Sequence, residues 1–166
     1  MDLKSCETEV LALAQALRQR GWHLASAESC TGGLIAAACT AVAGSSDWFE
    51  RGYVTYSNAS KAEMLGVAPA LIAKHGAVSE AVARAMALGT VERAHVELGV
   101  AVTGIAGPGG ATPGKPVGTV WLAVASQTAT GEPKTTTVRL QLGGGRTDVR
   151  EQTVLHALRH LRAVLG

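Results

Sequence analysis

The residues best placed to do chemistry stand in the stretch "SAESCTGGL", where a serine and a cysteine are adjacent. A strand that ends at Glu28 and a helix that begins near Thr31 would place Ser29 at the turn between them, with its hydroxyl exposed. The N–H groups that follow, and the positive end of the helix, would face the same space. They could hold a developing oxyanion while Ser29 attacks a carbonyl carbon. A serine that only caps the helix also fits this local pattern, because the G-x-S-x-G elbow is absent.

Cys30 is the rival nucleophile. A thiol at a helix N-terminus has a lowered pKa and can attack a carbonyl. Adjacent residues point in different directions, however, so only one of Ser29 and Cys30 can face a substrate, and a small thiol in such a place often packs in the core. The three cysteines, Cys6, Cys30 and Cys39, show no paired spacing. They predict reduced thiols rather than a disulfide framework or a zinc site.

A serine nucleophile needs a base, and Lys61 is the candidate. No histidine carries a local signature for this role, and His156 and His160 lack the glutamate of an H-E-x-x-H metal motif. Lys61 begins a predicted helix after "YVTYSNAS", so it should lie near a strand end, where open α/β sheets place their sites. A partly desolvated lysine loses its proton near neutral pH and could take one from Ser29. A solvated surface lysine is the alternative.

A long irregular stretch, "GIAGPGGATPGKP", is a second candidate site. Its first part follows a predicted buried strand and offers backbone N–H groups that could cradle a phosphate. A formal Walker-type match, "GGATPGK", fails because Pro116 stands where Ser or Thr is needed and a strand follows. Arg146, just before the last predicted helix, could share an anion with that helix's N-terminus. An exposed arginine on a flexible glycine hinge is the alternative.

The elements that would position these residues alternate early between strand and helix and end in a β-hairpin. Strands are expected within "WHLASAE", "RGYVTYS", "LGVAVTG", "PVGTVWLAVAS" and "KTTTVRLQL". Gly21 should end the first helix, Pro69 and Ser79 should begin two others, and a last amphipathic helix should begin near Thr147. This order predicts a single α/β domain over residues 1–166, a three-layer α/β/α fold with a mixed, mainly parallel sheet.

Composition narrows the class of protein. A chain of 166 residues is one domain by length and buries roughly 70% of its unfolded surface. A net charge of +2 and the lack of a Lys/Arg cluster argue against a nucleic-acid surface. No apolar run reaches about 18 residues, and the start "MDLKSCETEV" is too acidic for a signal peptide. The chain is therefore expected to be soluble and cytoplasmic, without membrane contact.

A specific combination of segments spans the chain from about Leu11 to Leu161. They read "SAESCTGGLIAA", "GSSDWFERGYVTYSNASKAEMLGV", "GAVSE", "AVTGIAGPGG" and "KPVGTVWLAVA". Together they resemble the CinA C-terminal domain family, whose enzymatic members are nicotinamide-nucleotide amidases, serine amidohydrolases assisted by lysine. The resemblance implies Ser29 as the nucleophile and Lys61 as its base, and it implies no metal and no other cofactor.

The resemblance also assigns further residues. Tyr56 in "YSN" matches a tyrosine beside the nucleophile, Ser46 in "GSS" a second active-site serine, and Thr103 in "TGIAGP" an active-site threonine. Arg146 matches the arginine of a segment that usually reads Gly-Asp-Arg, with Gly145 in place of the aspartate here. The expected substrate-binding residues are the turn after the nucleophile, the glycine loop and this arginine: Cys30, Thr31, Gly32, Gly33, Gly104, Gly107 and Arg146.

The implied activity is hydrolysis of the carboxamide of nicotinamide mononucleotide to nicotinate mononucleotide and ammonia, a step of pyridine nucleotide recycling. The resemblance also suggests a homodimer or a higher homo-oligomer. One alternative is a non-catalytic binding module associated with competence or DNA damage. Retention of the serine, tyrosine, lysine and threonine together argues against it. The other alternative is an amidase for a different small amide.

Overall fold

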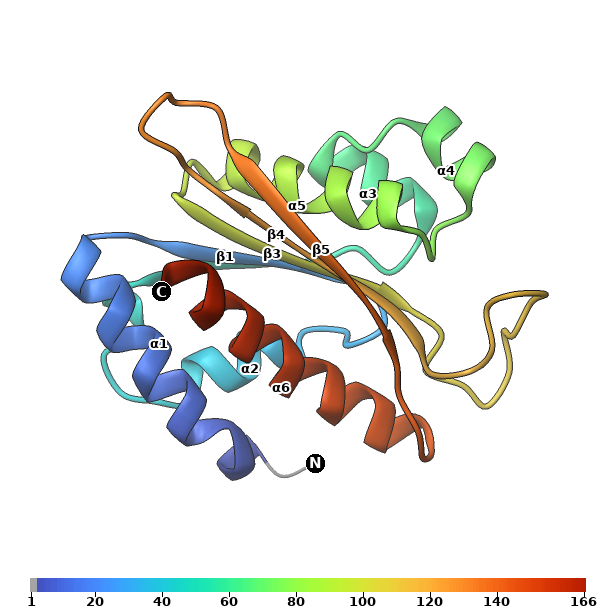
Figure 1. The fold of residues 1–166 in the computed structure, drawn as a ribbon, viewed down its shortest axis with the longest axis horizontal. Helices are drawn as coiled ribbons and strands as arrows, with labels where there is room; N and C mark the ends of the chain where they lie inside the picture. The colour runs from blue at the N-terminus through green and yellow to red at the C-terminus, as the bar shows by residue number, and fades with distance from the viewer. Residues whose placement is uncertain (1–2) are drawn as a thin grey trace.

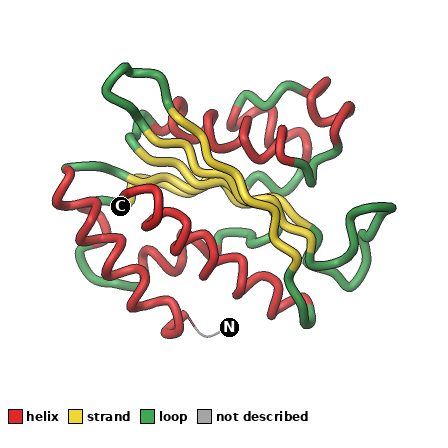
Figure 2. The backbone as a smooth tube through the Cα atoms, in the orientation of Figure 1, coloured by secondary structure: helices red, strands yellow, loops and turns green. Residues whose placement is uncertain are grey.

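The structure of the chain is a computed structural model that describes residues 3–166. Figure 1 shows one twisted sheet with helices packed on both of its faces, and Figure 2 shows the same three layers coloured by element type. The three-layer α/β/α fold expected from the sequence is therefore confirmed. Within the described residues, no helix is both long enough and apolar enough to cross a membrane.

The sheet has five strands in the order β2-β1-β3-β4-β5. They are β1 (Leu24–Glu28), β2 (Phe49–Val54), β3 (Leu98–Gly104), β4 (Thr119–Ser126) and β5 (Lys134–Gln141). β1 runs parallel to both β2 and β3, whereas β4 runs antiparallel to β3 and to β5. The sheet is mixed, as predicted, and the carboxyl ends of β2, β1 and β3 lie together at one edge.

Six α-helices cover the two faces. On one face lie α1 (Glu7–Arg20), α2 (Leu34–Thr40) and α6 (Arg146–Leu165); on the other lie α3 (Asn58–Leu65), α4 (Pro69–His75) and α5 (Glu80–Ala94). Short 3-10 helices span Leu3–Cys6 and Ser45–Asp47. Each layer has its own buried apolar cluster, one between the sheet and α1, α2 and α6, the other mainly between the sheet and α5.

The position of α3, which carries Lys61, depends on a close contact with α5. A Cβ at Gly89 of α5 would stand 2.1 Å from the carbonyl oxygen of Leu65 at the end of α3. No side chain fits there, so glycine lets the two helices approach. The N-terminus of α3 is closed by a capping box in which Ser57 and Ser60 bind each other's backbone N–H groups. Packing and capping together fix where the first turn of α3 points.

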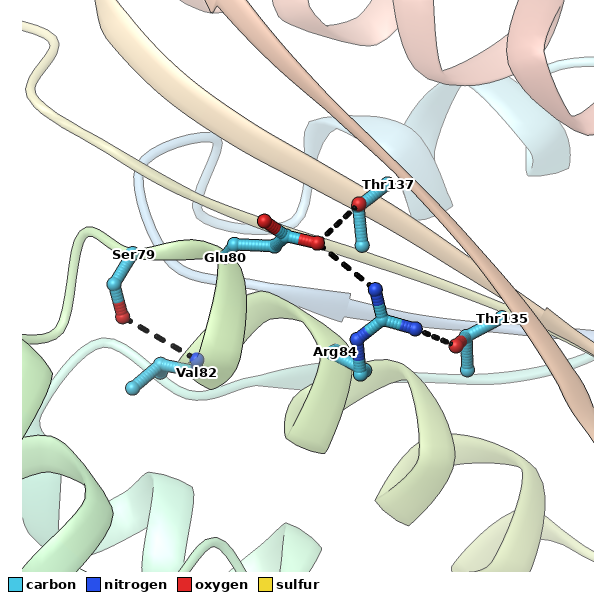
Figure 3. Close-up of polar contacts among 6 residues, drawn as sticks. All are labelled: Ser79, Glu80, Val82, Arg84, Thr135 and Thr137. Carbon is cyan, nitrogen blue, oxygen red and sulfur yellow. Dashed lines mark hydrogen bonds and ion pairs between the residues drawn. The ribbon is translucent and has the colours of Figure 1, made fainter.

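The start of α5 is tied to the edge strand β5, as Figure 3 shows. The Ser79 hydroxyl accepts a hydrogen bond from a backbone N–H in the first turn, which confirms the predicted cap. The Glu80 carboxylate accepts hydrogen bonds from Arg84 at 2.8 Å and from Thr137 at 2.9 Å. Arg84 also donates to Thr135. These side chains hold β5 against α5.

Three of the predicted helix boundaries agree with the structure, and the start of α2 differs. α1 ends at Gly21, which is left-handed with φ 63°, and Pro69 stands in the first turn of α4, both as predicted. α6 begins at Arg146, one residue before Thr147. α2 begins at Leu34 instead of near Thr31, because the residues between form a separate turn that a buried carboxylate organises.

Candidate active site

A pocket of about 200 Å³ opens at the edge of the sheet where the parallel strands end. Ser29 follows directly after β1, Tyr56 comes two residues after β2, and Thr103 lies in the last part of β3. Open α/β sheets place their binding sites at this edge. The pocket is lined by residues from both helix layers and from the connections between strands and helices: Ser29, Cys30, Tyr56, Asn58, Lys61, Ala77, Val78, Thr103, Gly104, Ala106 and Arg146.

The two residues expected to act together lie within contact of each other. Lys61 Nζ is 3.3 Å from Ser29 Oγ. The same nitrogen is 2.9 Å from the carbonyl oxygen of Thr55 and 3.5 Å from that of Ser57, so the connection between β2 and α3 surrounds it with neutral acceptors. On the other side, the Ser29 N–H donates to the Val102 carbonyl at 3.0 Å. That bond joins the nucleophile's backbone to β3.

Lys61 is almost completely buried, with 1% of its surface exposed. No carboxylate pairs with it in the part of the chain that the structure describes. Burial in this environment disfavours the ammonium form and lowers the pKa of Lys61, and the neighbouring Cys30 opposes this to a smaller degree. A lysine with a lowered pKa has a larger neutral fraction near pH 7. It can therefore accept a proton.

Cys30 lines the pocket but is a poor nucleophile. Its side chain is 5% exposed, and burial raises the pKa of the thiol to about 12, with a weaker contribution in the same direction from the charge of Glu28. The thiolate is the reactive form of cysteine, and almost none is present at neutral pH. Of the two adjacent candidates, Ser29 is the one whose side chain contacts Lys61.

Glu28 organises the turn that carries Ser29. Its carboxylate is fully buried and accepts five hydrogen bonds. The donors are the hydroxyls of Ser26 (3.2 Å) and Thr31 (2.7 Å) and the backbone N–H groups of Gly33 (3.0 Å), Ile35 (3.0 Å) and Ala36 (2.9 Å). Because the first N–H groups of α2 point at this carboxylate, the positive end of the helix is compensated inside the protein.

This arrangement changes the expected role of the residues after Cys30. Thr31, Gly32 and Gly33 do not line the pocket. The Gly33 N–H is bound to Glu28, and the Gly32 N–H donates to the Ser29 carbonyl at 3.2 Å. Neither is free for a substrate. Cys30, the residue directly after Ser29, is the member of this turn that lines the pocket.

Arg146 connects two walls of the pocket. One guanidinium nitrogen donates to the Gly107 carbonyl at 2.9 Å, and another donates to the Tyr56 hydroxyl at 2.9 Å. The Tyr56 hydroxyl is thus held at Arg146, while Ser29 and Lys61 contact each other directly. Gly145 caps α6, and the Asp148 carboxylate accepts its N–H at 2.7 Å. An acidic residue three positions later thereby supports the helix start.

The glycine loop between β3 and β4 contributes its base to the pocket and projects its tip away from the body of the protein (Figure 1). Gly104 and Ala106 line the pocket, whereas Gly107 reaches it only through its bond to Arg146. Gly104 has no room for a side chain, since a Cβ would stand 2.6 Å from Val120. Thr103 donates to the Ala77 carbonyl at 2.9 Å, which holds the segment before α5 against β3.

Ser46 lies apart from the other assigned residues. It stands in the 3-10 helix just before β2, at the amino end of a strand that runs parallel to β1. Ser29 follows the carboxyl end of β1, so the two serines are at opposite edges of the sheet. Ser46 is exposed and does not line the pocket. The structure does not place it beside the nucleophile of its own chain.

Three residues near the site escaped the sequence reasoning. Asn58 lines the pocket at the start of α3. The Glu28 carboxylate accepts hydrogen bonds from the turn after Ser29, and Arg150 of α6 donates to the Thr31 carbonyl at 2.9 Å. The glutamate was visible in "AESC", but nothing in its immediate neighbours indicates that it caps a helix. Across residues 3–166, no group of three or more His, Cys, Asp and Glu side chains could hold a metal ion.

The fold and the pocket define an α/β/α domain with a serine–lysine pair where its parallel strands end. The chain belongs to the CinA C-terminal domain family, whose model matches residues 7–165. It is 50% identical over 149 residues to the nicotinamide-nucleotide amidohydrolase PncC of Escherichia coli K12, covering 90% of this chain and 88% of that protein. The solved structure of the competence/damage inducible protein CihA from Agrobacterium tumefaciens is similar, with a TM-score of 0.90, 42% identity and coverage of 96% and 95% of the two chains.

Another relative, named for competence damage and not for an enzymatic activity, is a longer protein than this chain. The putative competence-damage inducible protein of Symbiobacterium thermophilum is 48% identical over 163 residues, which is 96% of this chain and 38% of that protein. The same type of domain therefore occurs both as most of a short protein and as a minor part of a longer one.

Proposed function

We propose that this protein hydrolyses the carboxamide of nicotinamide mononucleotide, giving nicotinate mononucleotide and ammonia. That the chain is an amidohydrolase follows from its similarity, at about half of all positions, to relatives named nicotinamide-nucleotide amidohydrolases. The observation that carries the proposed mechanism is the contact between Ser29 and a buried lysine that has no carboxylate partner among the described residues.

The neutral amine of Lys61 has the right number of bonding groups for a base in this position. It carries two N–H bonds and one lone pair. Two carbonyl oxygens, those of Thr55 and Ser57, can take the N–H groups, which leaves the lone pair for the hydroxyl hydrogen of Ser29. Lys61 then removes the Ser29 proton as the oxygen attacks the amide carbon.

The tetrahedral intermediate places a negative charge on the former carbonyl oxygen. The backbone N–H of Cys30, which lines the pocket next to Ser29, is the donor proposed to receive it. The Lys61 ammonium returns its proton to the amide nitrogen, which leaves as ammonia, and Ser29 is acylated by the nicotinyl group. Lys61 then removes a proton from a water molecule, whose oxygen attacks the ester carbon. The Lys61 ammonium returns this proton to the leaving Ser29 oxygen, and nicotinate mononucleotide is released.

The ribose phosphate is proposed to bind at Arg146, with backbone groups at the base of the glycine loop. The guanidinium lines the pocket, and its two present partners are the neutral oxygens of Gly107 and Tyr56. A phosphate can accept two parallel, charge-assisted hydrogen bonds from a guanidinium, and these are stronger than hydrogen bonds to neutral oxygens. The pocket mouth would therefore bind the anion, and the carboxamide would point toward Ser29.

The test is ammonia release from nicotinamide mononucleotide by the purified chain. The wild-type protein and Ser126→Ala, a matched serine at the opposite edge of the sheet, should release ammonia, and Ser29→Ala should not. Ammonia from other small amides but not from the mononucleotide would contradict the substrate and favour the broader amidase. Undiminished turnover by Ser29→Ala would contradict the nucleophile, and a folded wild-type chain without any amidase activity would favour the non-catalytic module.

Two further expectations stay predictions. The homodimer or higher oligomer implied by the family resemblance is tested by light scattering of the purified chain. A cytoplasmic location is tested by fractionation of the cells that produce it.

A further inference from the structure

Arg150 of α6 reaches the turn that carries the nucleophile without lining the pocket. Its Nη2 donates to the Thr31 carbonyl at 2.9 Å, although the two residues are 119 positions apart in the sequence. A Cβ at Gly32 would lie 3.6 Å from the same nitrogen, so the guanidinium packs directly against the Thr31–Gly32 peptide. Arg150 is therefore in a position to act on the turn and not on the substrate.

We propose that Arg150 is a positioning residue that holds the turn in which Ser29 and the Cys30 N–H face the pocket. This inference rests on the proposed function of the pocket as an acyl-transfer site. "Positioning" means here that Arg150 fixes the Thr31–Gly32 peptide, and through it the turn that follows Ser29, without touching the reacting atoms.

The contacts of Thr31 explain how a distant arginine could have this effect. The Thr31 hydroxyl is held by Glu28 at 2.7 Å, and its carbonyl is held by Arg150. The next N–H, that of Gly32, donates to the Ser29 carbonyl. The peptide after Thr31 is thus fixed on both edges and the side chain is fixed as well, so Thr31 anchors the turn that carries Ser29 and Cys30. Removing Arg150 frees one of these three constraints.

The burial of the Arg150 guanidinium also costs free energy of folding. Its Nε is buried and has no hydrogen-bond partner among the described residues. A buried, unpaired donor lowers stability, so packing alone does not account for an arginine here. The positive charge acts on the turn too, since Arg150 works to lower the pKa of Cys30 against the larger effect of burial. The same charge would favour negative charge on an oxyanion at the neighbouring backbone.

The test compares Arg150→Met, which keeps most of the aliphatic stem, with Arg150→Lys and with a matched control on the same helix. The control is Arg159→Met, because Arg159 is half exposed and pairs with Glu9 on the far side of the domain. For each protein, kcat and KM for nicotinamide mononucleotide, the melting temperature, and the rate of Ser29 labelling by a fluorophosphonate probe are measured. Labelling is located by mass spectrometry.

Arg150→Met should lower kcat by about 10- to 100-fold and change KM by less than about threefold, because oxyanion donors act in the transition state. Ser29 labelling should slow by a similar factor. Arg150→Lys, which retains the charge but not the planar fork, should fall between wild type and Arg150→Met. Arg159→Met should match wild type. If Arg150→Met does not fold, a wild-type kcat in Arg150→Lys overturns the proposal.

The rate of Ser29 labelling distinguishes a failure of this inference from a failure of the proposed function. If the wild-type protein is labelled at Ser29 but releases no ammonia from the mononucleotide, the proposed substrate is wrong and the labelling rates decide the role of Arg150. Equal labelling rates, or an equal kcat, in wild type and a folded Arg150→Met overturn the positioning role alone. A wild-type protein that neither turns over nor is labelled at Ser29 overturns both.

Discussion

Replacing Glu28 with glutamine tests how the nucleophile's turn is held. The side chain keeps its shape, but one acceptor oxygen becomes an N–H₂ donor and the charge is lost. If the amide oxygen keeps the three donors now on Oε2, the amide nitrogen faces the Ala36 N–H at the former Oε1 position. Two donors then confront each other, and the N–H of Ala36 loses its partner. The Ser26 hydroxyl can rotate to accept from the new amide.

The magnitude follows from these contacts. One orphaned, buried N–H costs about 1–2 kcal/mol, and three hydrogen bonds that lose their charged acceptor weaken by about 0.5–1 kcal/mol each. The sum predicts that Glu28→Gln lowers the free energy of unfolding by about 3–5 kcal/mol. For a domain of this size, such a loss lowers the melting temperature by roughly 10 °C.

The assay is urea unfolding at neutral pH with Glu80→Gln as the control. Glu80 lies in the first turn of α5 and accepts hydrogen bonds from a hydroxyl and an arginine, but its side chain is 48% exposed. Loss of its charge should cost little, because solvent screens an exposed ion pair. If Glu28→Gln is destabilised no more than Glu80→Gln, the buried carboxylate does not hold the turn and the argument built on it is wrong.

The remaining predictions concern the pocket itself. Cys30→Ala should keep kcat within about threefold of wild type, because a thiol that stays protonated does no chemistry; a dead Cys30→Ala with an active Ser29→Ala would make the enzyme a thiol amidase. Arg146→Ala should raise KM for the mononucleotide by about 10- to 100-fold, with a smaller change in kcat, because a remote phosphate contact supplies uniform binding worth about 1.5–3 kcal/mol; an unchanged KM would move the phosphate to the glycine loop. Lys61→Met should be more stable than wild type at neutral pH, by about 1.4 kcal/mol for each unit by which burial lowers the pKa of Lys61. Between the folded and unfolded pKa values of Lys61 the unfolded chain binds more protons, so the stability of the wild-type protein rises with pH. The stability advantage of Lys61→Met therefore shrinks toward pH 10.5. Urea unfolding of both proteins from pH 7 to 10 measures this difference in stability, and a difference independent of pH would contradict the lowered pKa.

Much of the fold could be predicted because its signals are local. The strand "LGVAVTG" is a continuous apolar run between turn residues, and β3 occupies it with six of its seven residues buried. Gly21 and Pro69 mark helix ends by the backbone geometry that these residues favour, and Ser79 marks one by its hydroxyl cap. The start of α2 could not be predicted in this way. It is set by Glu28, the last residue of the preceding strand, which reaches over the five residues of turn between β1 and α2.

The residues of the site also divide into those that local sequence signals predict and those whose place depends on tertiary packing. The proximity of Ser29 and Lys61 could be inferred because both follow the ends of neighbouring parallel strands. Arg150 could not, since its contact with the turn arises only when α6 packs beside α2 and carries no sequence signal at either end. The expectation that the N–H groups of Gly32 and Gly33 would face a ligand assumed an uncompensated helix end, and a buried carboxylate occupies that end instead.

The two buried ionisable side chains of the site, Glu28 and Lys61, have opposite electrostatic surroundings. Glu28 is surrounded by five donors, so its negative charge is stabilised by hydrogen bonds where solvent cannot reach. Lys61 is surrounded by neutral oxygens and has no counter-charge, so burial acts against its ammonium form. A carboxylate placed beside Lys61 would stabilise the ammonium and raise its pKa. In the proposed mechanism, the binding of Glu28 to the start of α2 therefore supports both the turn and the lysine, because the same charge paired to Lys61 would leave Ser29 without a proton acceptor.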